Sequence, residues 1–348
     1  MARFVVLGAG AVGGAVGARL AMSGSDVLLV ARGDHGRAIA ADGLRLDSPA
    51  GSQRVRIPVV ETLQPGTLGT GDVVLLSTKS QDTGAALDQV VAAGGPDVPV
   101  VCMQNGIANE RAALRRFSSV YGMVVVVPGT HLEAGVVVLS ADDPCGSLHL
   151  GRYPSGSPSP SPSPSPSPSP SSASSPTPTP TVDERAEEIA GALRRAGFWS
   201  EVLPDVMAWK RAKLLMNLAN ALQALCGLEA DAADLASAAR EEGRACFAAA
   251  GLAVTEVATF RQRAQPLGPA PANAAGRQGG SSWQSLARGL GSIETDYLNG
   301  EIVLLGRLHG VPTPVNEVLQ RAAGEQAWAG SPPGSVSPSA LRAALGWT

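Results

Sequence analysis

The first hundred residues alternate short, continuous apolar runs with segments of helical periodicity. Continuous apolar runs are typical of strands that are buried on both faces of a parallel sheet. The predicted strands cover residues 3–7, 26–32, 72–79 and 97–106. The predicted helices between them cover residues 11–23, 82–94 and 107–117. This alternation predicts a doubly wound α/β domain around a parallel sheet.

Two further stretches belong to the same predicted domain. Residues 43–60 alternate apolar and polar positions around a turn, which predicts a β-hairpin, and residues 120–151 contain three more strand-like pieces. Residues 182–204 read as a helix, a glycine and a strand, and this unit completes the α/β domain.

A Ser/Pro-rich tract interrupts this domain from Pro154 to Thr181. Its side chains cannot bury a core, so residues 154–181 are expected to be a disordered insertion. The entropy of closing a loop grows only logarithmically with its length, so a fold tolerates such an insertion. A domain linker and a phosphorylated docking segment remain open as alternatives.

Strand patterns end at residue 204, and helical periodicity takes over. The predicted helices cover residues 205–226, 230–250, 281–290, 293–309 and 314–327. The chain therefore divides into an α/β domain, residues 1–204, and an all-helical domain, residues 205–348. A length of 348 residues suits two domains.

Composition narrows the classes of function. The net charge of −3 gives no general basic field for nucleic acid or for an acidic membrane surface. The four cysteines and four histidines are scattered, so we expect free thiols and no metal site. No apolar stretch is long enough to predict a membrane span, and we expect a cytoplasmic protein.

A glycine-rich turn lies directly after the first predicted strand and opens the first helix. Gly8, Gly10 and Gly13 form the pattern G-x-G-x-x-G that binds the pyrophosphate of a dinucleotide, which makes the first domain Rossmann-type. The predicted cofactor loop consists of Gly8, Ala9, Gly10, Ala11, Val12 and Gly13.

The end of the second strand indicates which dinucleotide is bound. An NAD site usually has an acidic residue there to bind the ribose 2′-hydroxyl, whereas this strand ends in Arg32, with Arg37 nearby. A guanidinium binds a 2′-phosphate in a bidentate manner, which predicts NADP(H). Asp34 could bind a ribose instead and is the argument for NAD(H).

Lysine is rare in this chain, which makes its positions informative. Of 27 basic residues only Lys79, Lys210 and Lys213 are lysines. Lys79 and Asn105 end two predicted parallel strands, and ligands bind beyond such strand ends, so we expect both side chains to face the nicotinamide region.

The predicted helix 205–226 carries polar residues along one face. Trp209, Lys213, Asn217 and Asn220 are spaced to share that face, and Lys210 lies on a flanking line. An ammonium can release a proton when its pKa is lowered, whereas a guanidinium in practice cannot. We therefore expect at least one of Lys213 and Lys210 to be a proton donor, and helix geometry alone does not choose between them.

These motifs together resemble the ketopantoate reductase family. The matching segments, in order, are GAGAVGG, STKSQDT, QNGIANE, PGTHLEAGVV, WKRAKLLMN, SSW and ETDYLNGEIVLLGRLHGVPTPVNEVL. The resemblance implies NADPH-dependent reduction of a 2-keto acid. It assigns catalysis to Lys213, assisted by Glu294. It also implies substrate-binding roles for Lys79, Asn105, Asn217, Asn220 and Ser282, and cofactor contacts for Lys79 and Asn105.

Three departures from the family pattern concern the substrate side. Ala221 stands where the family usually has its second helical asparagine, Trp283 stands where methionine is usual, and residues 293–296 read Ile-Glu-Thr-Asp instead of Thr-Glu-Ile-Asp. The resemblance predicts reduction of 2-dehydropantoate in pantothenate and coenzyme A biosynthesis, by a chain that could form a homodimer. Another 2-keto acid, an opine-type dehydrogenase and a catalytically silent NADP(H) sensor are the alternatives.

Overall fold

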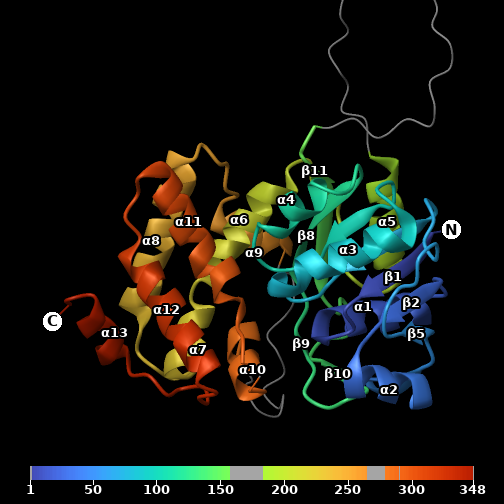
Figure 1. Cartoon of the computed structure of the whole chain (residues 1–348), viewed down its shortest axis with the longest axis horizontal. Helices are drawn as coiled ribbons and strands as arrows, with labels where there is room; N and C mark the ends of the chain where they lie inside the picture. Colours follow the sequence, from blue (N-terminus) through green and yellow to red (C-terminus); the bar gives the residue numbers. More distant parts are fainter. Residues whose placement is uncertain (1, 157–182, 265–278, 290, 348) are drawn as a thin grey trace, which may run out of the picture.

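The computed structural model describes residues 2–156, 183–264, 279–289 and 291–347. Figure 1 shows a half built from sheets and flanking helices beside a half built from helices alone, with α6 where the two halves meet. The predicted fold class is therefore confirmed: a parallel-sheet α/β domain precedes a helical domain. The boundary between residues 204 and 205 stays a prediction, and the Ser/Pro-rich tract lies outside the described residues from position 157 onward.

The main sheet has seven strands in the order β11-β8-β7-β6-β1-β2-β5. The neighbours from β8 to β5 pair in parallel, and β11 is antiparallel to β8. The strand order runs outward in both directions from β1, as a doubly wound sheet requires. The strands are β1 (Arg3–Leu7), β2 (Val27–Val30), β5 (Val59–Val60), β6 (Asp72–Leu76), β7 (Val100–Cys102), β8 (Val120–Val126) and β11 (Ser147–Tyr153).

Helices cover both faces of this sheet. Apolar residues of α1 and α5 pack with one set of strand side chains, and those of α3 and α4 pack with another. The continuous apolar runs of the strands are thus explained by burial on two faces. The elements are α1 (Ala11–Met22), α2 (Gly33–Asp42), η1 (Ser80–Asp82), α3 (Thr83–Gly94), α4 (Asn109–Leu114) and α5 (Glu184–Arg195).

A second sheet of four strands has the order β4-β3-β10-β9. The predicted hairpin is correct only for β3 (Leu44–Ser48) and β4 (Gly51–Val55), because β5 leaves it and joins the main sheet beside β2. The remaining strands are β9 (Gly129–Thr130) and β10 (Val136–Leu139). The pairing of β10 with β3 is parallel and joins segments about ninety residues apart, which no local pattern predicts.

The helical domain packs around its own apolar core. Its described part also contains α9 and α13, which the periodicity did not predict. Among the described residues, no helix is both long and apolar enough to cross a membrane. The elements are α6 (Val206–Asn217), α7 (Asn220–Cys226), α8 (Ala233–Ala249), α9 (Val257–Ala264), α10 (Ser281–Ala287), η2 (Glu294–Tyr297), α11 (Asn299–His309), α12 (Pro314–Trp328) and α13 (Pro338–Ala344).

Two predicted helices are each divided in the structure. The helix predicted over 205–226 breaks at residues 218–219, between α6 and α7. The one predicted over 293–309 begins as the 3₁₀ turn η2, and Leu298, with φ −115° and ψ −88°, separates it from α11. The break falls within the predicted polar face, so that Trp209, Lys213 and Asn217 lie on α6 whereas Asn220 begins α7.

Candidate active site

The glycine-rich loop after β1 is shaped for close approach of a ligand to its backbone. Gly8 has φ +102°, a conformation that disfavours other residues, and a Cβ on Gly13 would lie 2.0 Å from the carbonyl oxygen of Gly8. A Cβ on Gly10, in contrast, would have no atom of the described residues within 4 Å apart from the adjoining backbone. The twelve-residue helix α1 begins there without an acidic residue in its first turn. The loop therefore fits a dinucleotide pyrophosphate at a helix N-terminus.

Charged side chains surround the start of α2, at the end of β2. Arg32 is exposed and occupies the position that precedes α2. Asp34 and Arg37 form an exposed ion pair with 2.5 Å between Oδ1 and Nη2. Since Arg37 already pairs with Asp34, Arg32 is the better candidate for a 2′-phosphate, and the pairing also weakens the case for Asp34 as a ribose ligand.

Lys213 of α6 points back to the edge where the parallel strands end. Its Nζ donates to Asn105 Oδ1 at 2.8 Å and to the carbonyl oxygen of Val125 in β8. Burial, together with the nearby charge of Lys210, lowers the pKa of Lys213 to about 7. Together with Gly106, these residues line a small pocket between α6, β8 and the loop after β7. The arrangement can release or take up a proton near neutral pH.

Lys210 has an environment unlike that of Lys213. It is 3% exposed and forms an ion pair with Glu110, which is fully buried in α4. Its Nζ also donates to the carbonyl oxygen of Gln104 at 3.0 Å. Lys210 therefore neutralises a buried carboxylate, and it also lines the small pocket together with Lys213. A flanking role of its charge stays a prediction.

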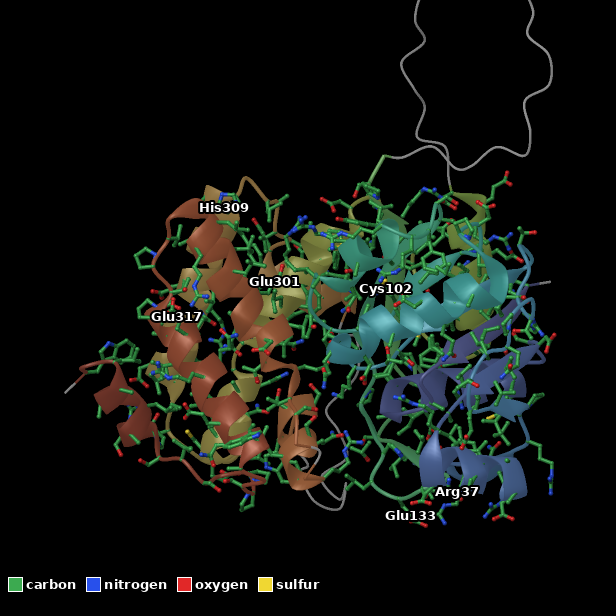
Figure 2. All side chains as sticks on the ribbon, in the orientation of Figure 1. Arg37, Cys102, Glu133, Glu301, His309 and Glu317 are labelled. Atoms are coloured by element: carbon green, nitrogen blue, oxygen red, sulfur yellow. The ribbon has the colours of Figure 1, made fainter. Side chains whose placement is uncertain are left out.

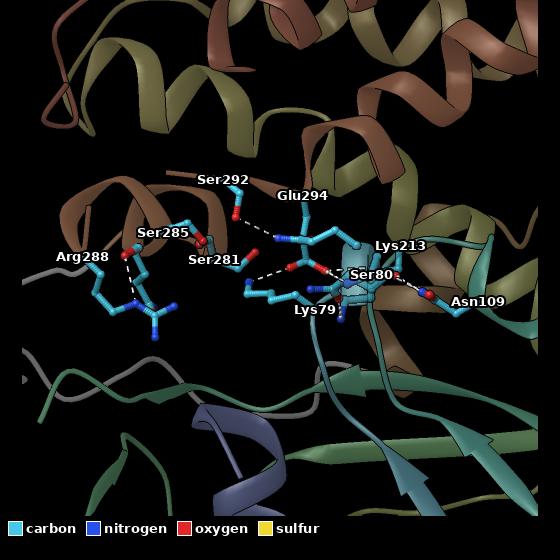
Figure 3. Close-up of polar contacts among 12 residues, drawn as sticks. Lys79, Ser80, Asn109, Lys213, Ser281, Ser285, Arg288, Ser292 and Glu294 are labelled. Carbon is cyan, nitrogen blue, oxygen red and sulfur yellow. Dashed lines mark hydrogen bonds and ion pairs between the residues drawn. The ribbon is translucent and has the colours of Figure 1, made fainter. Parts of the chain in front are cut away.

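Lys79 follows β6 and meets the helical domain. Its Nζ lies 2.6 Å from Oε2 of Glu294 in η2, and Glu294 Oε1 accepts from the backbone N–H and the hydroxyl of Ser80 at 3.1 and 3.0 Å. Figure 3 shows these side chains reaching toward one another, with Ser292 above them. The structure thus brings Glu294 to Lys79, where the resemblance placed it beside Lys213.

A buried chain of hydrogen bonds stands behind this ion pair. Asn109 donates to Ser80 Oγ at 3.1 Å and accepts from Thr83 Oγ1 at 2.7 Å, and Gln104 donates to Thr83 Oγ1 at 3.0 Å. Gln104 precedes Asn105, so the chain connects the surroundings of Lys79 with those of Lys213. The roles of Ser80 and Asn109 were not predicted from the sequence. Ser80 could have been noticed as a polar residue directly after a predicted strand end, and Asn109 as a polar residue at the start of a short helix.

The remaining predicted residues lie on the helical domain. Asn217 ends α6 and is half-buried, and Asn220 begins α7 with its Oδ1 beside Gly280. Ser282 is 3% exposed in α10, which packs against α7. Trp209 is not among the residues that line the small pocket and packs with Phe260 at a ring distance of 6.0 Å. The structure therefore groups Asn220 with the helix of Ser282 and excludes Trp209.

Comparison with known families finds two matches that cover most of the chain. Residues 4–155 match the family described as ketopantoate reductase PanE/ApbA, and residues 205–326 match the C-terminal part of the same family. The candidate residues from Gly8 to Glu294 fall within these two segments, in agreement with the two-domain fold.

Individual relatives agree with this assignment. The chain is similar to the 2-dehydropantoate 2-reductase of Archaeoglobus fulgidus, with 27% identity over 326 residues that cover 91% of this chain and 95% of the relative. It is 30% identical to the enzyme of the same description from Pyrococcus horikoshii over 218 residues, covering 62% and 61% of the two chains.

Solved structures share the architecture. A PanE/ApbA family ketopantoate reductase from Ralstonia eutropha superposes with a TM-score of 0.73 at 28% identity, covering 94% of this chain and 99% of the other. D-mandelate dehydrogenase in complex with NADH and anilino(oxo)acetate has a TM-score of 0.76 over the same shares. Its identity of 19% makes this second likeness one of fold alone.

Proposed function

The chain belongs to the ketopantoate reductase family and is an oxidoreductase of the 2-dehydropantoate 2-reductase type, and from this premise we propose that it reduces 2-dehydropantoate to pantoate with NADPH. This reaction is a step of pantothenate and coenzyme A biosynthesis. The observation that carries the proposal is the pair Lys213 and Asn105, a buried amine with a pKa near neutrality at the edge where a dinucleotide would present its nicotinamide.

Lys213 is proposed as the general acid. NADPH, when bound, supplies the hydride to C2 of the keto acid, and the carbonyl oxygen then becomes an alkoxide. Lys213 holds the proton that this oxygen needs, and general acid catalysis of this kind contributes roughly 10²–10⁴-fold. Asn105 and the Val125 carbonyl fix the ammonium at the pocket, so the proton has a defined position before the substrate arrives.

Lys79 and Glu294 are proposed to orient the substrate. The ammonium of Lys79 can bind the carboxylate of a 2-keto acid. Glu294, which accepts a hydrogen bond from Ser80, holds that ammonium in place. Glu294 is therefore proposed to orient Lys79, and not Lys213 as the resemblance implied. Asn217, Asn220 and Ser282 are proposed to contact the rest of the substrate from the helical side.

NADP(H) is proposed as the cofactor in preference to NAD(H). The support is the exposed guanidinium of Arg32 at the end of β2 together with the engagement of Asp34 by Arg37. The loop from Gly8 to Gly13 serves the pyrophosphate in either case, so the choice depends on the contacts after β2.

A panel of 2-keto acids at fixed NADPH tests the proposed substrate. We expect the highest kcat/KM with 2-dehydropantoate, measured as loss of NADPH absorbance. A higher value with another branched 2-keto acid would transfer the proposal to that substrate, and the three departures at Ala221, Trp283 and Ile293 are the reason to include such acids. Binding of NADPH without turnover of any acid would favour the silent sensor.

A further inference from the structure

His35 joins two segments that are far apart in sequence. It lies in the first turn of α2, and its Nε2 is 2.7 Å from the carbonyl oxygen of Ala9 in the cofactor loop. Its Nδ1 accepts from the backbone N–H of Gly135 at 2.9 Å. Gly135 has φ +76° and directly precedes β10 of the second sheet. The imidazole therefore ties the loop that would cradle the pyrophosphate to the smaller sheet.

These two partners determine the protonation state of the ring. A backbone N–H can only donate, so Nδ1 must present its lone pair to Gly135. A carbonyl oxygen can only accept, so Nε2 must carry the hydrogen that points to Ala9. The contacts thus require the neutral imidazole with its hydrogen on Nε2. An imidazolium carries a hydrogen on both nitrogens and would oppose the N–H of Gly135.

The surroundings of His35 also favour the neutral imidazole. The ring of His131 lies against it with 4.0 Å between the centroids and 47° between the ring planes, and His131 Nδ1 lies 3.0 Å from the carbonyl oxygen of Val136. Burial lowers the pKa of His35, and the neighbouring His131 lowers it further, against a smaller opposite effect of the hydrogen bond to Ala9.

The carboxylates near the ring are already paired with arginines. Arg288, which donates to the carbonyl oxygen of His131, adds a positive charge on this side. On the helix of His35, Asp34 pairs with Arg37, and in the segment before β10 Glu133 pairs with Arg45 of β3 at 3.4 Å. Figure 2 shows Arg37 and Glu133 close together at the lower edge of the molecule, where α2 meets this segment. Carboxylates paired with arginines do little to stabilise a positive charge on His35.

We propose that His35 is a positioning residue for the dinucleotide, which holds the glycine-rich loop in its binding form only while the imidazole is neutral. The inference rests on the proposed function for the presence of a nicotinamide dinucleotide. It follows that cofactor affinity decreases as the pH falls and His35 takes up a proton. The protonated ring keeps its bond to Ala9 but loses its bond to Gly135, so the ring no longer anchors the loop to the smaller sheet.

The test is the pH dependence of NADPH binding, measured by the fluorescence of the bound cofactor without substrate. His35→Gln is the matched variant, because a glutamine amide offers an acceptor and a donor at similar spacing but does not titrate. We expect the ratio of the wild-type Kd to the variant Kd to rise about tenfold between about pH 8 and about pH 5. The 2′-phosphate of NADPH titrates in both proteins and cancels in this ratio.

Two further variants serve as controls. His131→Phe keeps a ring beside His35 but removes the neighbour that lowers the pKa of His35, so its Kd should still increase in acid, beginning at a higher pH. His35→Leu loses both hydrogen bonds and should bind weakly without the extra acid dependence. Near-UV circular dichroism and Tm at each pH verify that every protein is folded.

The outcomes separate this inference from the proposed function. Parallel pH curves for wild type and His35→Gln, or tighter wild-type binding in acid, would overturn the role of His35 while leaving the cofactor proposal intact. A wild-type protein that fails to bind NADPH at about pH 8 would overturn the proposed function and the inference with it.

Discussion

The substrate side and the cofactor side of the candidate site use charge in different ways. On the substrate side Lys210 and Glu110 are almost completely buried, and Lys213 is desolvated beside neutral acceptors. On the cofactor side Asp34 and Arg37 are 85% and 66% exposed at their side chains. Buried charges interact strongly and change pKa values, whereas exposed charges are screened by water. The substrate side should therefore control chemistry and stability, and the cofactor side only binding.

The largest effect is expected at Lys213. Lys213→Arg keeps the charge but removes the transferable proton, so kcat should fall by roughly 10²–10⁴-fold. NADPH affinity should change little, because the loss concerns the transition state. Steady-state kinetics with 2-dehydropantoate and a separate fluorescence titration measure the two quantities. An active Lys213→Arg enzyme would mean that another group supplies the proton.

The next effect is expected at Lys210 and concerns folding. Lys210→Met leaves the carboxylate of Glu110 buried without its partner, which should lower the free energy of unfolding by about 3–5 kcal/mol. The matched control is Lys210→Met combined with Glu110→Leu, which removes both charges and should recover most of the loss. Urea denaturation measures both variants. Equal destabilisation of the single and double variants would show that shape, and not charge, decides this site.

The loss of the Lys213 proton should be visible in the pH profile of kcat/KM. With a pKa of about 7, the amine loses its proton as the pH rises through that value. Because reduction needs the proton, kcat/KM should fall about tenfold per pH unit above neutrality. Lys213→Arg should lack this limb. A wild-type profile that stays level up to about pH 9 would contradict the lowered pKa.

The same shift predicts a pH-dependent stability. Between pH about 7 and the ordinary lysine value of 10.5, the unfolded chain binds a proton at Lys213 that the folded chain has released. Its contribution to the free energy of unfolding should therefore rise with pH across this window. Comparing wild type with Lys213→Met in urea melts isolates this contribution, since the variant has no group to titrate there.

A smaller and more selective effect is expected at Arg32. Arg32→Ala should weaken NADPH by about 1.5–3 kcal/mol, because a charge-assisted bond to the 2′-phosphate is lost. NADH lacks that phosphate and should bind nearly as before. Fluorescence titrations with both cofactors give the comparison, and an equal loss for both would remove Arg32 from the phosphate site.

The smallest effect is expected at Arg37. Its ion pair with Asp34 is exposed, and exposed pairs contribute about 0–1 kcal/mol. Arg37→Ala should accordingly change Tm and NADPH affinity only slightly. A loss as large as that of Arg32→Ala would show that Arg37 also contacts the cofactor and that the contrast between the two sides is incomplete.

The parts of the site that could be predicted from the sequence depend on local geometry. Gly8 and Gly13 are required by backbone conformation and close packing within a few residues, so their spacing alone indicates the turn. The approach of Lys213 to Asn105 needed two further premises, the parallel strand ends and the family resemblance. The turn thus follows from one short segment, whereas the contact of Lys213 with Asn105 joins residues 108 positions apart.

The parts that could not be predicted depend on contacts distant in sequence. Nothing near Lys210 reveals that Glu110, a hundred residues earlier, is its partner. The break after α6 comes within an uninterrupted helical pattern, so periodicity alone does not predict it. The second sheet likewise requires β3 to meet β10 across the chain.

The contact between η1 and η2 restricts how such reductases can be recombined. Lys79 and Ser80 come from the first domain, yet they enclose Glu294 from the second. On the same side the carbonyl oxygen of Tyr297 would lie 2.7 Å from a Cβ on Gly106, so the two backbones meet where only glycine leaves room. A chimera that crosses between parents at the domain boundary inherits one half of each contact. An active chimera therefore requires residues 79–80, 106 and 294–297 to come from the same parent, because they contact one another across the two domains.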